Sequence, residues 1–62
     1  MHEIGINVKI TTKGALYIQD IIENINISDV YPVLSIDKGD ELYEIEIDGH
    51  FFWLKEDEIA EV

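Results

Sequence analysis

The stretch LYEIEIDGHFFWLK, residues 42–55, contains two runs of strand-like sequence on either side of a turn signal. In the first run, Tyr43, Ile45 and Ile47 alternate with acidic residues, which is the period of two that is typical of a half-buried strand. Asp48-Gly49 favours a two-residue hairpin turn of the primed type. We therefore predict a hairpin whose strands cover residues 42–48 and 50–55.

The residues that flank this hairpin predict further short strands. On the C-terminal side, the acidic turn 56–58 interrupts the chain before a last strand over residues 59–62. On the N-terminal side, a turn at 37–40 follows a strand over 30–36. Pro32 lies inside that strand and marks a sheet edge or a strand start, because proline has no N–H to donate to a ladder.

The first half of the chain is less regular. Residues 4–10 carry an apolar side chain at every second position and predict the first strand. Residues 15–27 are ambiguous: their apolar residues recur at helical spacing, but the end of the segment also alternates like a strand. The residues with helical spacing are Ile18, Ile21, Ile22 and Ile25. We favour a short helix or helical turn near 18–24, within a long excursion.

Five short strands with little helix favour a small all-β fold, namely a closed or nearly closed five-stranded barrel. Closure also removes the free sheet edges at which another chain pairs. With 62 residues the chain is expected to be a single domain, residues 1–62. A domain of this size buries only about 60% of its extended surface on folding, so it depends on its apolar core or on self-association.

The order of these elements resembles an SH3-like barrel, with a long loop after the first strand, a three-strand meander, a one-turn 3₁₀ element and a final strand. Within residues 29–62, the runs VYPVLSID, YEI and FWLKEDE resemble small uncharacterised SH3-like β-barrel proteins of Gram-positive (Firmicute) phages and prophages. The resemblance implies a fold and a phage or mobile-element origin, and it implies no catalytic residues. The first half lacks the acidic loop and paired aromatic residues with which eukaryotic SH3 domains hold proline-rich peptides.

The charge balance narrows the classes of partner. Fourteen Asp and Glu residues stand against four Lys and no Arg, which gives a net charge of −10. Because nucleic-acid affinity comes mainly from Lys and Arg, we expect no direct DNA or RNA binding and favour a protein partner with a basic surface. No run is apolar enough for a membrane span, and Met1-His2-Glu3 is unlike a signal peptide. We expect a cytoplasmic protein, in the host cytoplasm if it is phage encoded.

A row of carboxylates on the first hairpin strand is one candidate binding surface. Glu44, Glu46 and Asp48 occupy alternate positions, so they share one face at intervals of about 6.5 to 7 Å. Three interpretations stay open. The row is a solvated face that keeps a small Ile-rich protein soluble, a docking site for a basic partner, or an imitation of a nucleic-acid backbone.

The aromatic residues of the returning strand form a second candidate surface. Phe51 and Trp53 point to one side of the strand, while Phe52 shares the other side with His50 and Leu54. If the second group faces the core, the first forms an exposed aromatic patch of the kind that provides binding hot spots. The alternative is that the excursion over 15–27 covers it.

The sequence favours neither an enzyme nor a metal or cofactor site. The chain has no Cys, and neither His2 nor His50 has an evident nucleophile beside it in sequence. The acidic turn after residue 36 does not match a calcium-loop register, and it contains the lysine Lys38. We therefore expect a non-enzymatic interaction module without cofactor, catalytic residue or metal ligand. The alternatives are a nucleic-acid-mimic inhibitor of a DNA- or RNA-binding protein and a structural subunit of a homo-oligomer.

Overall fold

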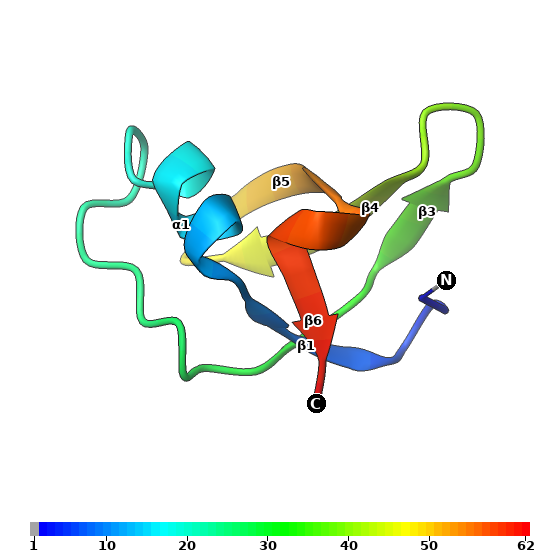
Figure 1. The fold of residues 1–62 in the computed structure, drawn as a ribbon, viewed down its shortest axis with the longest axis horizontal. Helices are drawn as coiled ribbons and strands as arrows, with labels where there is room; N and C mark the ends of the chain where they lie inside the picture. The colour runs from blue at the N-terminus through cyan, green and yellow to red at the C-terminus, as the bar shows by residue number, and fades with distance from the viewer. Residues whose placement is uncertain (1) are drawn as a thin grey trace.

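The computed structural model describes residues 2–62 and contains two three-stranded sheets, one of which includes the predicted hairpin (Figure 1). The hairpin strands have nearly the bounds that the alternation predicts, and one α-helix and one 3₁₀ turn complete the fold. In chain order the elements are β1 Asn7–Ile10, α1 Thr12–Ile18, β2 Tyr31–Pro32, β3 Ser35–Asp37, β4 Leu42–Ile47, β5 His50–Lys55, η1 Glu56–Glu58 and β6 Ile59–Glu61.

Two three-stranded antiparallel sheets, in the orders β2-β1-β6 and β3-β4-β5, enclose one core. The last strand pairs with the first, so residues 59–61 lie beside residues 8–10. Both sheets and the helix contribute buried apolar side chains to a single cluster. Its members are Val8, Ile10, Ile18, Val33, Tyr43, Ile45, Ile47, Phe52, Leu54 and Ile59. The expectation of a small, mostly-β protein is confirmed.

The strand count and the closure differ from the prediction. The described strands number six instead of five, and they form two sheets instead of one closed barrel. The segment over 30–36 is divided because the chain passes from one sheet to the other within it. The amide of Val33 donates to the carbonyl of Ile6, whereas the next amide, that of Leu34, donates to the carbonyl of Glu44. Pro32 lies in the edge strand β2, as expected for a residue without an N–H.

The helix lies earlier than predicted. It begins after Thr11, whose hydroxyl oxygen accepts a hydrogen bond from the amide of Gly14 at 3.2 Å, and it ends at Ile18. The prediction of a helix over 18–24 is therefore wrong. The capping threonine starts the helix about one and a half turns before the Ile-rich run. Residues 19–30 are turns and irregular loop. Within them Ile22 and Ile25 pack against the core, while Ile21 and Ile27 are exposed.

The first strand is also shorter than its apolar pattern. Residues 4 and 5 form a turn in which Gly5 has a φ of +87°, so β1 begins only at Asn7. The exposed fraction of Ile4 is 66%, which places it outside the core. In contrast, the acidic single turn over 56–58 and the last strand are present as the spacing predicts.

Candidate interaction face

A tight turn sets the register of the hairpin that carries the predicted site residues. Asp48 and Gly49 have φ angles of +51° and +83°, and two positive values at the central positions are those of a type I′ turn. The pairing that follows places Glu44 opposite Trp53 and Glu46 opposite Phe51. The carboxylates and the aromatic rings were predicted as two surfaces, and the register brings them together on one.

We call the side of the β4–β5 hairpin that carries Glu44, Glu46, Phe51 and Trp53 the outer face. The opposite side of the hairpin packs into the core, where Ile45, Phe52 and Leu54 are all buried. Phe51 and Trp53 keep exposed fractions of 60% and 40%. The excursion over 15–27 therefore does not cover them, and the outer face is an open surface of alternating acid and aromatic side chains.

Asp48, the third predicted acid, lies apart from this row. It occupies the first central position of the turn and is not part of β4, which ends at Ile47. Its carboxylate lies close enough to Tyr31 to affect that residue: burial, followed by the charges of Asp29 and Asp48, raises the pKa of the Tyr31 hydroxyl. The acidic row consequently consists of Glu44 and Glu46, and Asp48 belongs to the tip of the hairpin.

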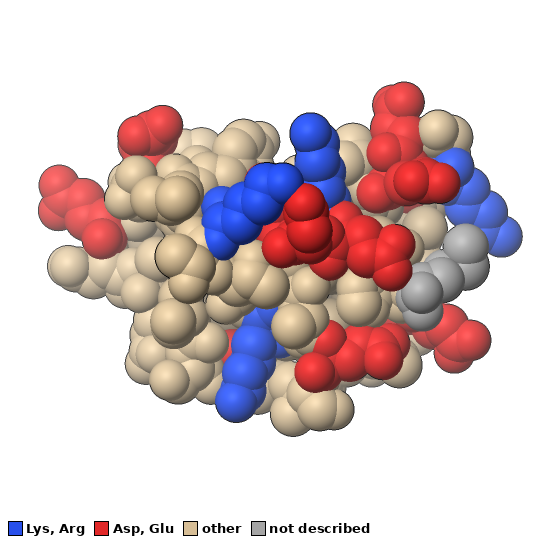
Figure 2. Space-filling model, viewed as in Figure 1, with Lys and Arg blue, Asp and Glu red and all other residues tan. Residues whose placement is uncertain are grey.

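A second group of acids lies at the opposite end of the hairpin. The turn between β3 and β4 and the single turn η1 together line a hollow of about 420 Å³. Figure 2 shows acidic side chains gathered over both elements, with lysines beside them. The lining residues are Asp40, Glu41, Lys55, Glu56 and Asp57. Across residues 2–62, no group of three or more potential ligands has the arrangement that holds a metal ion.

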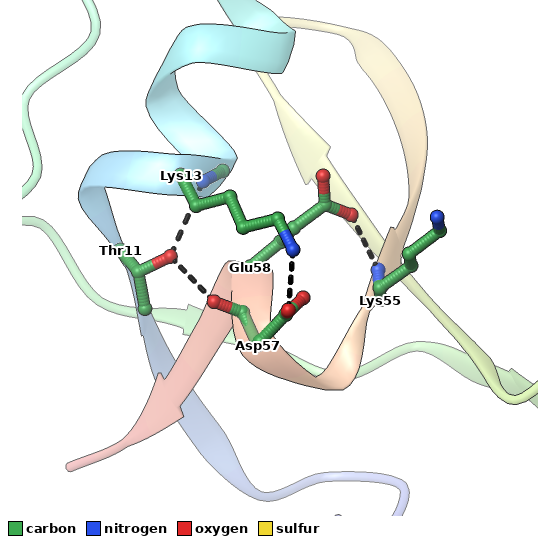
Figure 3. A network of polar contacts seen from close by, with 6 residues as sticks. Thr11, Lys13, Lys55, Asp57 and Glu58 are labelled. Carbon is green, nitrogen blue, oxygen red and sulfur yellow. Dashed lines mark hydrogen bonds and ion pairs between the residues drawn. The ribbon is translucent and has the colours of Figure 1, made fainter.

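Part of this acidic turn has a structural role (Figure 3). The hydroxyl of Thr11 donates to the carbonyl oxygen of Asp57 at 2.9 Å, and the Lys13 ammonium group donates to the Asp57 carboxylate. This hydrogen bond lowers the pKa of Asp57 and raises that of Lys13. Glu58 is buried, and its carboxylate accepts the backbone N–H of Lys55 at 2.7 Å. The contacts of Thr11 and Lys13 join the start of α1 to η1, and the contact of Glu58 joins η1 to the end of β5.

The buried Glu58 is a residue that the sequence reasoning missed, because it treated 56–58 only as an acidic turn between two strands. The available signal was its position three residues after the end of a strand, where a glutamate side chain reaches back to a backbone N–H. In the part of the chain that is described, no hydrogen bond joins a histidine ring to a serine. His50 is exposed, and His2 is buried with its ring 4.9 Å from that of Tyr43.

Compared with models of protein families, with curated proteins and with solved structures, the chain matches none. Within residues 2–62, no helix is long and apolar enough to cross a membrane. The function must therefore be argued from the surface itself, and the feature with the most defined chemistry is the outer face.

Proposed function

We propose that this protein is a non-enzymatic interaction module that binds a protein partner with a basic surface through the outer face. The observation that carries the proposal is the interleaving of Glu44 and Glu46 with Trp53 and Phe51 across one hairpin. Exposed aromatic rings supply affinity when they lose contact with water, and neighbouring carboxylates steer a cationic partner and set its orientation. If the face served solubility alone, two exposed aromatic side chains would not be expected on it, because exposed apolar surface lowers solubility.

The test compares charge reversal on the outer face with an equal change elsewhere. Partners are captured from the native host with the wild-type protein and with the double variant Glu44→Lys/Glu46→Lys. The matched control is Asp20→Lys/Glu23→Lys, which changes the net charge equally at exposed positions of the excursion. A partner of the outer face is lost from the first variant and kept by the second, and titration with that partner after purification must repeat the difference.

Two measurements separate this proposal from the other functions considered. A nucleic-acid mimic displaces DNA or RNA from its target and loses affinity steeply as salt rises, because its contacts are purely ionic. Binding through the outer face depends on Trp53 as well, so Trp53→Ser weakens it even at high salt. A structural homo-oligomer reveals itself by the mass in dilute solution. If Asp20→Lys/Glu23→Lys abolishes capture and the outer-face variant does not, the proposal is wrong.

We also propose that the two sheets are an SH3-like arrangement that is open instead of fully closed. The support is the chain order: a long excursion after β1, the meander β3-β4-β5, the turn η1, and a last strand that returns to β1. The resemblance of residues 29–62 adds a phage or mobile-element origin and a place in the host cytoplasm to the proposal. The genes that neighbour this one test that origin.

A further inference from the structure

The open edge of β5 is a feature of the same hairpin that the proposed function leaves unused. β5 pairs only with β4, so its other side ends the sheet β3-β4-β5. In an antiparallel pair, opposite residues alternate between those that exchange backbone hydrogen bonds and those that do not. The residues next to a two-residue turn, Ile47 and His50, exchange them, and so does the pair Ile45 and Phe52.

Phe51 and Trp53 lie at the alternate positions, which do not exchange hydrogen bonds with β4. Their N–H and C=O groups are therefore directed away from β4. Two hydrogen bonds confirm this register. The carbonyl of Glu44, which lies opposite Trp53, accepts from Leu34 on the far side of β4. The N–H of Lys55, two residues after Trp53, likewise points away from β4 and donates to Glu58.

Nothing in the described chain pairs with these groups. No hydrogen bond among residues 2–62 reaches the backbone of Phe51 or Trp53 from the open side. Unpaired donors and acceptors along a strand edge are a template for a further strand. The Glu58 carboxylate occupies the N–H of Lys55, so the open part of the edge is limited to two residues that offer two donors and two acceptors.

We propose that the edge of β5 binds an extended segment of a basic protein as an added antiparallel strand, with arginine at the two positions that pair with Phe51 and Trp53. This inference rests on the proposed function and names the form of its partner. In an antiparallel pair the side chains of opposite residues lie on the same side of the sheet. Side chains of the added strand at these two positions therefore project over the outer face, next to the aromatic rings.

The chemistry of the outer face selects arginine at these positions. The carboxylates of Glu44 and Glu46 lie on β4, about 10 Å or two strand spacings from the added strand, with the rings of β5 between them. A long cationic side chain from the added strand crosses an aromatic ring of β5 and reaches the glutamate that extends toward that ring from β4. A guanidinium stacks on an aromatic face and pairs with a carboxylate in one plane, which an ammonium group does not do.

Charge also decides between an added peptide and a second copy of this chain. A second copy brings its own net charge of −10 to an edge that is flanked by acids. A basic segment brings the complementary charge, and the one lysine of β5 itself, Lys55, lies at the far end of the strand. The occupant that the observations favour is thus a basic strand from another protein.

The probe is the blocked peptide Thr-Arg-Thr-Arg-Thr, titrated against the ¹⁵N-labelled protein. In the free protein the amides of Phe51 and Trp53 exchange rapidly with solvent, while those of Phe52 and Leu54, which pair with β4, are protected. Saturating peptide must slow exchange at Phe51 and Trp53 specifically. If both amides already exchange slowly in the free protein and lose this protection on dilution, a second copy occupies the edge and the inference is wrong.

Two N-methylated peptides of equal charge separate strand addition from contact with the face alone. Methylation of the two Arg amides removes the donors that face β5, and we expect affinity to fall at least about tenfold. Methylation of the central Thr amide, which faces away, leaves affinity within about threefold. If both methylated peptides bind like the parent peptide, strand addition is refuted, and the proposal that the outer face binds the partner is kept. If the parent peptide does not bind, the inference fails, while the Glu44→Lys/Glu46→Lys comparison decides the proposed function independently.

Discussion

Gly14→Ala is predicted to destabilise the protein, although a glycine-to-alanine change within a helix normally stabilises by about 1 kcal/mol. A Cβ atom at Gly14 would lie 2.2 Å from the carbonyl oxygen of Glu58 and 3.0 Å from a methyl carbon of Ile10. The oxygen belongs to the backbone and accepts the amide of Thr11 at 3.1 Å, so it cannot move without losing that hydrogen bond. The close approach of α1 to η1 therefore requires glycine at this position.

The magnitude follows from these contacts. Overpacking of this kind costs about 1–3 kcal/mol, and loss of the Thr11 hydrogen bond adds about 1 kcal/mol. After subtraction of the helix-propensity gain, the free energy of unfolding falls by about 1–3 kcal/mol. For a domain of 62 residues, whose total stability is about 3–9 kcal/mol, this is a drop in the thermal unfolding midpoint of about 4–24 °C.

Urea unfolding followed by circular dichroism measures the change, with equal slopes required for the comparison. Gly39→Ala is the control, because a Cβ there meets only the Asp37 side chain at the ordinary distance of 3.4 Å. The free energy of unfolding of this control is expected to stay within about 0.5 kcal/mol of the wild-type value. A Gly14→Ala protein as stable as wild type, or more stable, would refute the packing of α1 on η1.

Three further predictions test the core, the buried acid and the ion pair. Phe52→Ala lowers stability by about 3–5 kcal/mol, whereas Trp53→Ser on the exposed side changes it by less than about 1 kcal/mol, both by chemical denaturation. Glu58→Ala leaves a backbone N–H at the end of β5 without its acceptor and costs about 1–3 kcal/mol, measured in the same way. Because Lys13 lowers the pKa of Asp57 below 3.8, the pair stabilises the folded state above that value and loses its effect as the pH falls further. The stability difference between wild type and Asp57→Asn must accordingly shrink in acid, and a difference that grows below pH 3.8 would contradict the pair.

The parts of the fold that the sequence predicts well are those governed by neighbouring residues. Strict alternation and a two-residue Asp-Gly turn leave little freedom to the hairpin, so β4 and β5 have nearly the expected bounds. The helix was misplaced because an Ile-rich run satisfies helical and strand spacing equally, and the cap at Thr11 decides where it starts. That cap is effective because α1 packs on η1, a contact across more than forty residues that no local pattern reveals.

The composition of the outer face follows from the turn by counting. Once Asp48 and Gly49 are the two loop residues, Glu46 must lie opposite Phe51 and Glu44 opposite Trp53, so the acids and the rings share one surface. What counting does not supply is whether that surface is open. That depends on where the excursion over 15–27 packs: Ile18, Ile22 and Ile25 pack on the core, and the rings of Phe51 and Trp53 stay exposed.

The open face and the open edge are consequences of a single alternation. The period of two that turns the side chains of Phe51 and Trp53 outward also turns their N–H and C=O groups away from β4. A partner strand that pairs with these backbone groups necessarily places every second side chain over the same rings and carboxylates. Backbone affinity and side-chain selectivity are therefore coupled in this hairpin. A one-residue change in the length of the Asp48-Gly49 turn would shift the register and remove both together.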